Sequence, residues 1–243
     1  MVDDAAVALS SDIAVGGHRL ARARLRSVAS LHSAETQAGT GWFAVRSGVF
    51  SNDLNGVVAD AEFVPDAELL VSLQEWFGVV PASWLAAAPS ARSSGLVLDA
   101  GWTAERTGRW AGRKAWRSAP SGDVRRVTGH SDLEAWLDVA EECGWFEGSS
   151  QRRERCALGA GLAWPRWLAW RDGRPVGMAT GIRVDGLLEV VDVAVIPSAR
   201  RQGIGTALVA GAVAGSYSSH IVIAAPSSDG WQLFRASASR MCQ

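Results

Sequence analysis

The sequence contains few cysteines and histidines and almost no lysine or tyrosine. Its three cysteines (Cys143, Cys156 and Cys242) show no metal-ligand spacing and its four histidines are scattered, so we expect neither a disulfide scaffold nor a metal site. Lys114 is the only lysine and Tyr217 the only tyrosine. With 24 basic and 25 acidic side chains, the net charge of −1 provides no field for binding a polyanion. We therefore expect no nucleic-acid partner.

The chain also lacks a typical targeting segment. Residues 1–4, Met-Val-Asp-Asp, are acidic where a signal peptide is basic. Residues 203–228 contain no Asp, Glu, Lys or Arg and are long enough to cross a bilayer, but the polar run at 216–220 interrupts them. We interpret this stretch as a helix, a turn and a strand, and we expect a cytoplasmic protein with no membrane partner.

The composition is that of a folded protein. Apolar residues make up 48% and charged residues 20% of the 243 residues, close to the average of globular proteins. Because domains commonly have roughly 100–200 residues, the length allows two. The turn-forming stretch at 117–122, Arg-Ser-Ala-Pro-Ser-Gly, is the best linker candidate. We expect two domains, residues 1–118 and 122–243, in a monomer or a homodimer.

Two hairpin signals organise the second domain. Asp172-Gly173 and Asp185-Gly186 separate three apolar runs, which predicts an antiparallel meander. The expected elements are a strand at 123–129, a helix capped by Ser131, a helix at 149–162, strands at 164–170, 175–184 and 187–196, a helix at 203–214, a strand at 221–225 and a helix at 230–237. For the first domain they are strands at 41–45, 56–61 and 82–87 and helices at 66–77 and near 90–98. This is an α/β (α+β) pattern.

Residues 191–208 have a pattern that predicts a binding site. A β-branched strand ends at Pro197, a basic turn with two glycines follows, and a helix of small residues begins. Such a turn directs free backbone N–H groups and the positive end of the helix dipole to one point, which is an anion site. Gly203 and Gly205 let the backbone approach a phosphate group closely, and Arg200 adds positive charge.

These residues resemble the signature of the GCN5-related N-acetyltransferase (GNAT) superfamily. The family pattern Arg/Gln-x-x-Gly-x-Gly/Ala is matched by Arg200, Gly203 and Gly205, behind a strand that ends with Val195 and Pro197. The expected order of elements in the second domain is also similar to that of the family. The resemblance implies the GNAT fold, a mixed central sheet flanked by helices.

The same resemblance implies acetyl-coenzyme A (acetyl-CoA) as the cosubstrate, with no metal. In such a protein the turn holds the pyrophosphate. The pantetheine arm lies along the exposed edge of the strand at 190–196, where the next strand splays away. The implied binding residues are Val193, Ala194, Val195, Arg200, Arg201, Gln202, Gly203, Ile204, Gly205, Thr206, Ser227 and Phe234.

Three residues of the strand are candidates for catalysis. Family members commonly direct one amide of this strand at the thioester carbonyl, where it stabilises the oxyanion, and the resemblance implies that here it is the N–H of Val193. An amine acceptor needs a base, and Glu189 lies where the histone acetyltransferase branch has its catalytic glutamate. The alternative for Glu189 is a solvated carboxylate at the strand end. Asp192 ranks second, because in a regular strand it points to the opposite face, although a bulge changes that.

The chain departs from the family pattern in two places. Phe234 stands where the family has a tyrosine that protonates the leaving thiolate, and Ala238-Ser239 replace Gly-Phe. The family's last two strands do not follow, whereas residues 95–114 resemble the family's end pattern and hairpin. The resemblance thus implies a tandem protein whose first half is a degenerate GNAT-like scaffold or acceptor-site wall. An unrelated α/β cap is the alternative.

We expect an N-acetyltransferase that moves an acetyl group to a primary amine by direct attack in a ternary complex. A small-molecule amine is the preferred acceptor. A protein N-terminus or lysine, or a non-catalytic acyl-CoA-binding module, remains as an alternative. An acetyl-cysteine route through Cys143 or Cys156 is less favoured, because single cysteines in helices are more often buried hydrophobes. Most tryptophans are expected to pack in the core.

Overall fold

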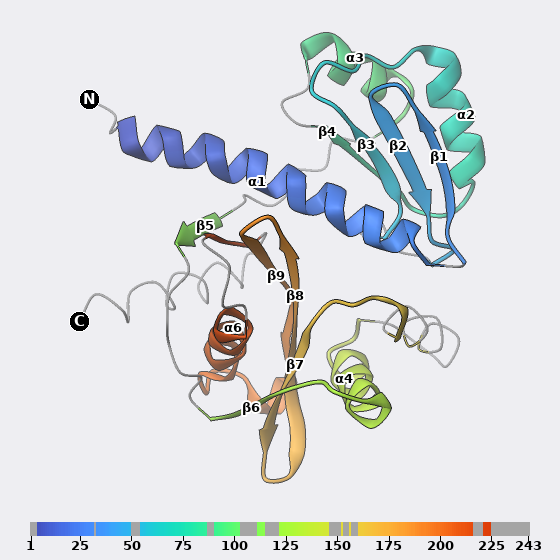
Figure 1. Cartoon of the computed structure of the whole chain (residues 1–243). Coiled ribbons are helices and arrows are strands. Elements are labelled where there is room, and N and C mark those ends of the chain that lie inside the picture. Colours follow the sequence, from blue (N-terminus) through green and yellow to red (C-terminus); the bar gives the residue numbers. More distant parts are fainter. Residues whose placement is uncertain are drawn as a thin grey trace. The chain divides into compact units, whose positions relative to one another are not determined.

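Two compact units make up the chain, Met1–Thr107 and Gly108–Gln243, which we call the first and the second unit (Figure 1). The expected boundary at 118–122 lies later in the sequence. The strand β5 (Ala111–Lys114), which precedes that expected boundary, pairs with β10 (Ile221–Ala224) of the second unit. The computed structural model describes residues 4–31, 33–49, 54–86, 90–102, 111–114, 122–145, 152, 156, 160–215 and 221–224.

A four-stranded sheet, in the order β1-β2-β3-β4, forms the first unit. The first three strands are antiparallel, and β4 pairs parallel to β3 after a helical crossover. The helix α1 packs against β2 and β4. The bounds are α1 (Asp4–Ala29), β1 (Glu35–Gly39), β2 (Trp42–Arg46), β3 (Gly56–Ala59), α2 (Ala67–Phe77), β4 (Ser83–Ala86) and α3 (Ala91–Asp99).

Most elements of the first unit lie where the sequence predicts them, but α1 and β1 were not anticipated. Over its second half, the buried side chains of α1 (Leu20, Ala21, Leu25 and Val28) recur at helical spacing, which is a sequence signal that the analysis of the first domain did not use. Tryptophans pack in this unit as expected. The Trp84 and Trp102 rings lie edge to face, with centroids 5.8 Å apart, beside Phe77.

A six-stranded mixed sheet, in the order β5-β10-β9-β8-β7-β6, forms the second unit. The strands from β6 to β9 are antiparallel neighbours, which confirms the meander, and β10 runs parallel to β9. The bounds are β6 (Asp123–Arg126), α4 (His130–Glu142), β7 (Arg166–Arg171), β8 (Arg174–Val184), β9 (Leu187–Val195), a 3-10 turn (Pro197–Ala199), α6 (Ile204–Ala214) and β10. The two sheets with their helices confirm the mixed α/β class.

The helices α4 and α6 cover opposite faces of this second sheet (Figure 1). A Cβ on Gly177 of β8 would lie 3.0 Å from Ile204 and Leu208, so this glycine lets α6 pack closely on its face. The next residue of β8, Met178, points to the other face because side chains alternate along a strand. Leu133 and Leu137 of α4 belong to the same buried core as Met178 and Leu208.

Some expectations for the second unit are corrected or lie outside the described residues. The helix α4 begins one residue before Ser131, and its N-cap is Gly129, so Ser131 is not the cap. Instead, the Asp132 carboxylate accepts a hydrogen bond from the backbone N–H of Thr128 at 2.9 Å. Most of the helix expected at 149–162, and all of that at 230–237, lie outside the described residues.

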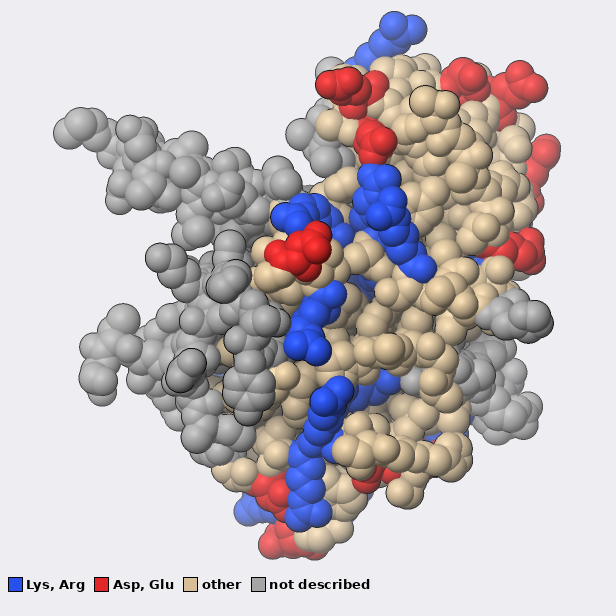
Figure 2. Space-filling view, in the orientation of Figure 1, with Lys and Arg blue, Asp and Glu red and all other residues tan. Residues whose placement is uncertain are grey.

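None of the described helices is both long and apolar enough to span a membrane. Basic and acidic side chains both appear on the face drawn in Figure 2, as the near balance of the two charges in the sequence suggests.

Candidate functional site

A β-bulge interrupts β9 at Asp192 and Val193. Thr180 of β8 faces Val191, and Met178 faces Ala194, so three steps along β9 match two along β8. Asp192 takes a positive φ of 55°, which is uncommon for a residue other than glycine. As in other bulges, the extra residue leaves the hydrogen-bonded ladder with β8. Val193, whose N–H the sequence assigns to the oxyanion, lies in this bulge.

On the other edge of β9, Leu187, Leu188 and Glu189 pair with β10, and no described strand pairs with 190–195. The side chains of residues 191–195 are half-buried. The residues that follow Ala224 of β10 lie outside the described residues, so the opening expected along this strand stays a prediction.

The turn between β9 and α6 has the geometry of an anion site. Arg201 (φ 64°) and Gly203 (φ 80°) are both left-handed, and Gly203 is the N-cap of α6. No side chain caps this helix end, so the amides of its first turn (Ile204, Gly205 and Thr206) face outward with the positive end of the dipole. The Arg200 guanidinium donates from Nε to the Val195 carbonyl at 3.0 Å, which fixes its side chain beside the turn.

A pocket of about 420 Å³ opens beside this turn. One wall consists of Gln202, Gly203, Ile204 and Ala207 at the start of α6, and the other comes from the ends of β6 and β7, including Trp170. The turn is thus next to a concave surface large enough for a part of a small ligand.

Glu189 and Asp192 differ from their expected placements. Glu189 has only 1% of its surface exposed, so the solvated strand-end alternative is wrong. It faces Ile182 across the ladder, on the same face as Thr180 and Met178 and away from α6. Asp192, released from regular alternation by the bulge, acts electrostatically on Arg166 of β7. Burial lowers the pKa of Arg166, and the charge of Asp192 opposes that effect.

The sequence did not indicate that Arg166, Thr180 and Trp136 lie together near these carboxylates. Arg166 faces Thr180 across β7 and β8, and its guanidinium lies 5.8 Å from the centroid of the Trp136 ring of α4. Thr180 is fully buried. Its Oγ1 and the Nε1 of Trp136 have no hydrogen-bond partner within the part of the chain that the structure describes. Only strand pairing and the packing of α4 reveal this cluster, because its members are 14 to 44 residues apart.

The remaining expected site residues are less informative. Ser227, Phe234 and the only tyrosine, Tyr217, lie outside the described residues. Burial raises the pKa of the Cys143 thiol and also that of Cys156. Since the thiolate is the reactive form, the raised pKa values argue against an acetyl-cysteine route.

The corresponding position of the first unit has no anion site. Its strands β1-β2-β3 followed by α2 and β4 have the same order and directions as β7-β8-β9 followed by α6 and β10. However, the Asp66 carboxylate caps α2 by accepting from the N–H of Leu69 at 2.8 Å. A carboxylate at this helix end repels a phosphate. In addition, β4 pairs with all four residues of β3, so these strands do not diverge.

Comparison with known proteins agrees with this geometry. Residues 131–216, from α4 through α6, match the acetyltransferase (GNAT) family. The second unit contains a GNAT domain. No curated protein matches the chain. The expectation of the family from Arg200, Gly203 and Gly205 is thereby confirmed for this unit.

One solved structure shows the same fold over most of the chain. It is a GCN5-related N-acetyltransferase from Kribbella flavida, 20% identical, with a TM-score of 0.62, and the alignment covers 88% of this chain and 86% of that one. At this identity the likeness concerns the fold. A functionally unknown conserved protein from Staphylococcus epidermidis is 14% identical over 76% of this chain and 81% of its own, with a TM-score of 0.48.

Proposed function

We propose that this protein is an acetyl-CoA-dependent N-acetyltransferase that acts by direct attack in a ternary complex. The observation that carries the proposal is the N-terminus of α6, entered through left-handed Gly203, next to the bulge of β9. A pyrophosphate fits the amides of that helix end, and the proposal places an extended pantetheine arm along β9 beyond Glu189.

The residues of the turn and of β9 then bind and orient the cosubstrate. The amides of Gly203, Ile204 and Gly205 and the charge of Arg201 hold the pyrophosphate. Val193, in the bulge, donates its N–H to the carbonyl oxygen of the thioester, where negative charge develops as the amine attacks. The nitrogen–carbon bond forms, the carbon–sulfur bond breaks, and the thiolate leaves with the electron pair of that bond.

Glu189 accepts the proton that the attacking amine must lose. Glu189 is only 1% exposed, so in this proposal a water molecule carries the proton from the amine to its carboxylate. The charge of Asp192 acts on Arg166 of β7, on the neighbouring side of the bulge. Asp192 therefore has a structural role in this proposal.

A small primary amine is the acceptor that this face fits best. A slender amine reaches a buried carboxylate more readily than a folded protein surface does.

The first unit is proposed to be a degenerate GNAT-like half. Its strand and helix order supports a common origin of the two halves, while the Asp66 cap and the fully paired β3 and β4 explain why it does not bind a phosphate. In this proposal only the second unit carries the acetyl transfer.

The test is release of the free thiol of CoA when purified protein meets acetyl-CoA and a panel of small amines and peptides. We expect thiol release with at least one small amine, and loss of release in Glu189→Gln. Binding of CoA by calorimetry without release for any amine or peptide would instead identify a non-catalytic acyl-CoA-binding module. Release with peptides alone would make a protein the acceptor.

A further inference from the structure

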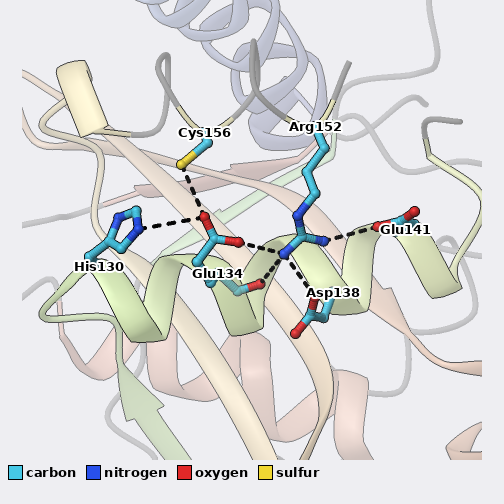
Figure 3. A network of polar contacts seen from close by, with 6 residues as sticks. All are labelled: His130, Glu134, Asp138, Glu141, Arg152 and Cys156. Atoms are coloured by element: carbon cyan, nitrogen blue, oxygen red, sulfur yellow. Dashed lines mark hydrogen bonds and ion pairs between the residues drawn. The ribbon is translucent and has the colours of Figure 1, made fainter. Parts of the chain in front are cut away.

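Three metal-ligating side chains of different chemistry meet on the second unit, at the surface of α4 (Figure 3). His130 and Glu134 are one helical turn apart, and Cys156 comes from a separate segment. His130 Nε2 lies 3.7 Å from Glu134 Oε1, and Cys156 Sγ lies 3.4 Å from the same oxygen. All three ligand atoms are within 4.8 Å of one another.

Arg152 orients the carboxylate of this cluster. Its Nη2 donates to Glu134 Oε2 at 2.6 Å and also lies 2.8 Å from Asp138, while Nη1 donates to Glu141 at 2.9 Å (Figure 3). The second carboxylate oxygen of Glu134, Oε1, is thereby turned toward His130 and Cys156. Partners that fix a ligand in this way are typical of metal sites.

Two of the three distances between ligand atoms are close to what a tetrahedral zinc ion requires. Bonds of about 2.3 Å to sulfur, about 2.0–2.1 Å to nitrogen and about 2.0–2.2 Å to oxygen place the ligand atoms roughly 3.4–3.6 Å apart. The distances from Glu134 to His130 and to Cys156 are 3.7 Å and 3.4 Å, and His130 and Cys156 lie within 4.8 Å of each other.

The local charge also suits a cation. Three carboxylates, those of Glu134, Asp138 and Glu141, surround the single guanidinium of Arg152. The site is therefore acidic overall although an arginine is part of it. The His130 side chain is 77% exposed, so an ion can enter from solvent and keep a water molecule as its fourth ligand.

We propose that His130, Glu134 and Cys156 form a binding site for Zn²⁺ or a similar divalent transition-metal ion. On binding, the sulfur–metal bond replaces the sulfur–hydrogen bond of Cys156, the proton goes to solvent, and no oxidation or reduction occurs. The ion ties the segment that carries Cys156 to α4. The site is independent of acetyl transfer and uses none of the residues assigned to it.

Linear spacing alone argues against a metal, as the sequence analysis concluded, because the three ligands stand 4 and 22 residues apart in the chain. The positions of Arg152 and Cys156 beside α4 bring the three ligands together, which spacing in the chain does not reveal. Cys143, the other described free cysteine, lies at the C-cap of α4 and is not a member of the cluster, so it offers a matched control.

The test is titration of tag-free, chelator-treated protein with Co²⁺, which reports a thiolate ligand by a charge-transfer absorption band and tetrahedral geometry by its visible bands. We expect one equivalent of Co²⁺ to produce both signals and one equivalent of Zn²⁺ to remove them. Cys156→Ser and His130→Ala should lose the bands, while Cys143→Ser should keep them. Circular dichroism of each variant checks that the fold is retained.

Two results would overturn the proposal. Wild-type protein that shows no charge-transfer band with Co²⁺ has no thiolate metal site. A band that persists in Cys156→Ser comes from another thiol, and the cluster is then only a hydrogen-bonded network. If Cys156→Ser fails to fold, His130→Ala distinguishes a metal site from a hydrogen-bonded network instead. The exposed His130 side chain contributes little to the core, so this variant should fold.

Discussion

Replacement of Gly203 by alanine tests the anion turn most directly. A Cβ at this position would meet nothing within 4 Å, so the change adds no clash. It does place a residue with a Cβ at φ 80°, where left-handed backbone costs about 1–2 kcal/mol outside glycine. Because folded domains have a free energy of unfolding of about 5–15 kcal/mol, the second unit should remain folded.

The effect on binding follows from the amides at this helix end. If the strained turn relaxes, at least one N–H of the first turn of α6 moves away from the pyrophosphate. A hydrogen bond to a charged group contributes about 1.5–3 kcal/mol, so CoA affinity should fall roughly 10- to 150-fold. Isothermal titration calorimetry measures the affinity, and thermal unfolding measures the loss of stability.

Gly48→Ala is the matched control. Gly48 also has a left-handed backbone, with φ 79°, and a Cβ there would again meet nothing within 4 Å, but it lies in the first unit, after β2. Both variants should lose similar stability, and only Gly203→Ala should lose CoA affinity. Unchanged CoA affinity in Gly203→Ala, or an equal loss in both variants, refutes the assignment of the turn.

Three other perturbations probe the base, the sheet edge and the Arg152 ion pair. Glu189→Gln should lower kcat at neutral pH by roughly 100-fold or more with CoA affinity unchanged, and steady-state kinetics that show normal turnover would move the base elsewhere. A fragment of residues 108–243, which keeps β5 on the edge of β10, should be soluble by sedimentation, whereas 121–243 should aggregate; a monomeric 121–243 would contradict this. Arg152 lowers the pKa of Glu134 from its ordinary 4.5, so this ion pair stabilises the fold above that pH and is lost as the pH falls through the lowered value. Arg152→Met should therefore show a weaker loss of stability on acidification, and an unchanged pH profile would show that the pair contributes nothing.

Local signals in the sequence determined much of the second unit. The pairs Asp172-Gly173 and Asp185-Gly186 adopt positive φ at all four residues, which is what tight hairpin turns require. They therefore predicted β7, β8 and β9 with nearly correct bounds. Arg200, Gly203 and Gly205 predicted the turn before α6, because a glycine in the left-handed region and a basic turn are visible in a short stretch of sequence.

Other features of the chain had no local signal. The helix α1 is different, because Ala21, Leu25 and Val28 stand at helical spacing and so gave a local signal that was overlooked, while only packing against β2 and β4 shows which strands cover that face. The first expectation for the cap of α4 was wrong because Thr128 and Asp132 form a hydrogen bond around the helix start that a capping pattern at Ser131 does not describe.

The burial of Glu189, the bulge at Asp192 and the meeting of His130 with Cys156 were decided by tertiary structure alone. Whether a strand carboxylate is solvated depends on β8 and β10 on either side of it, and a bulge is a difference in register between two strands. The sequence determined which residue types are available and where the chain turns. The chemistry of these residues depends on their distances from one another across the sheet and between segments. Those distances are set only when the core packs.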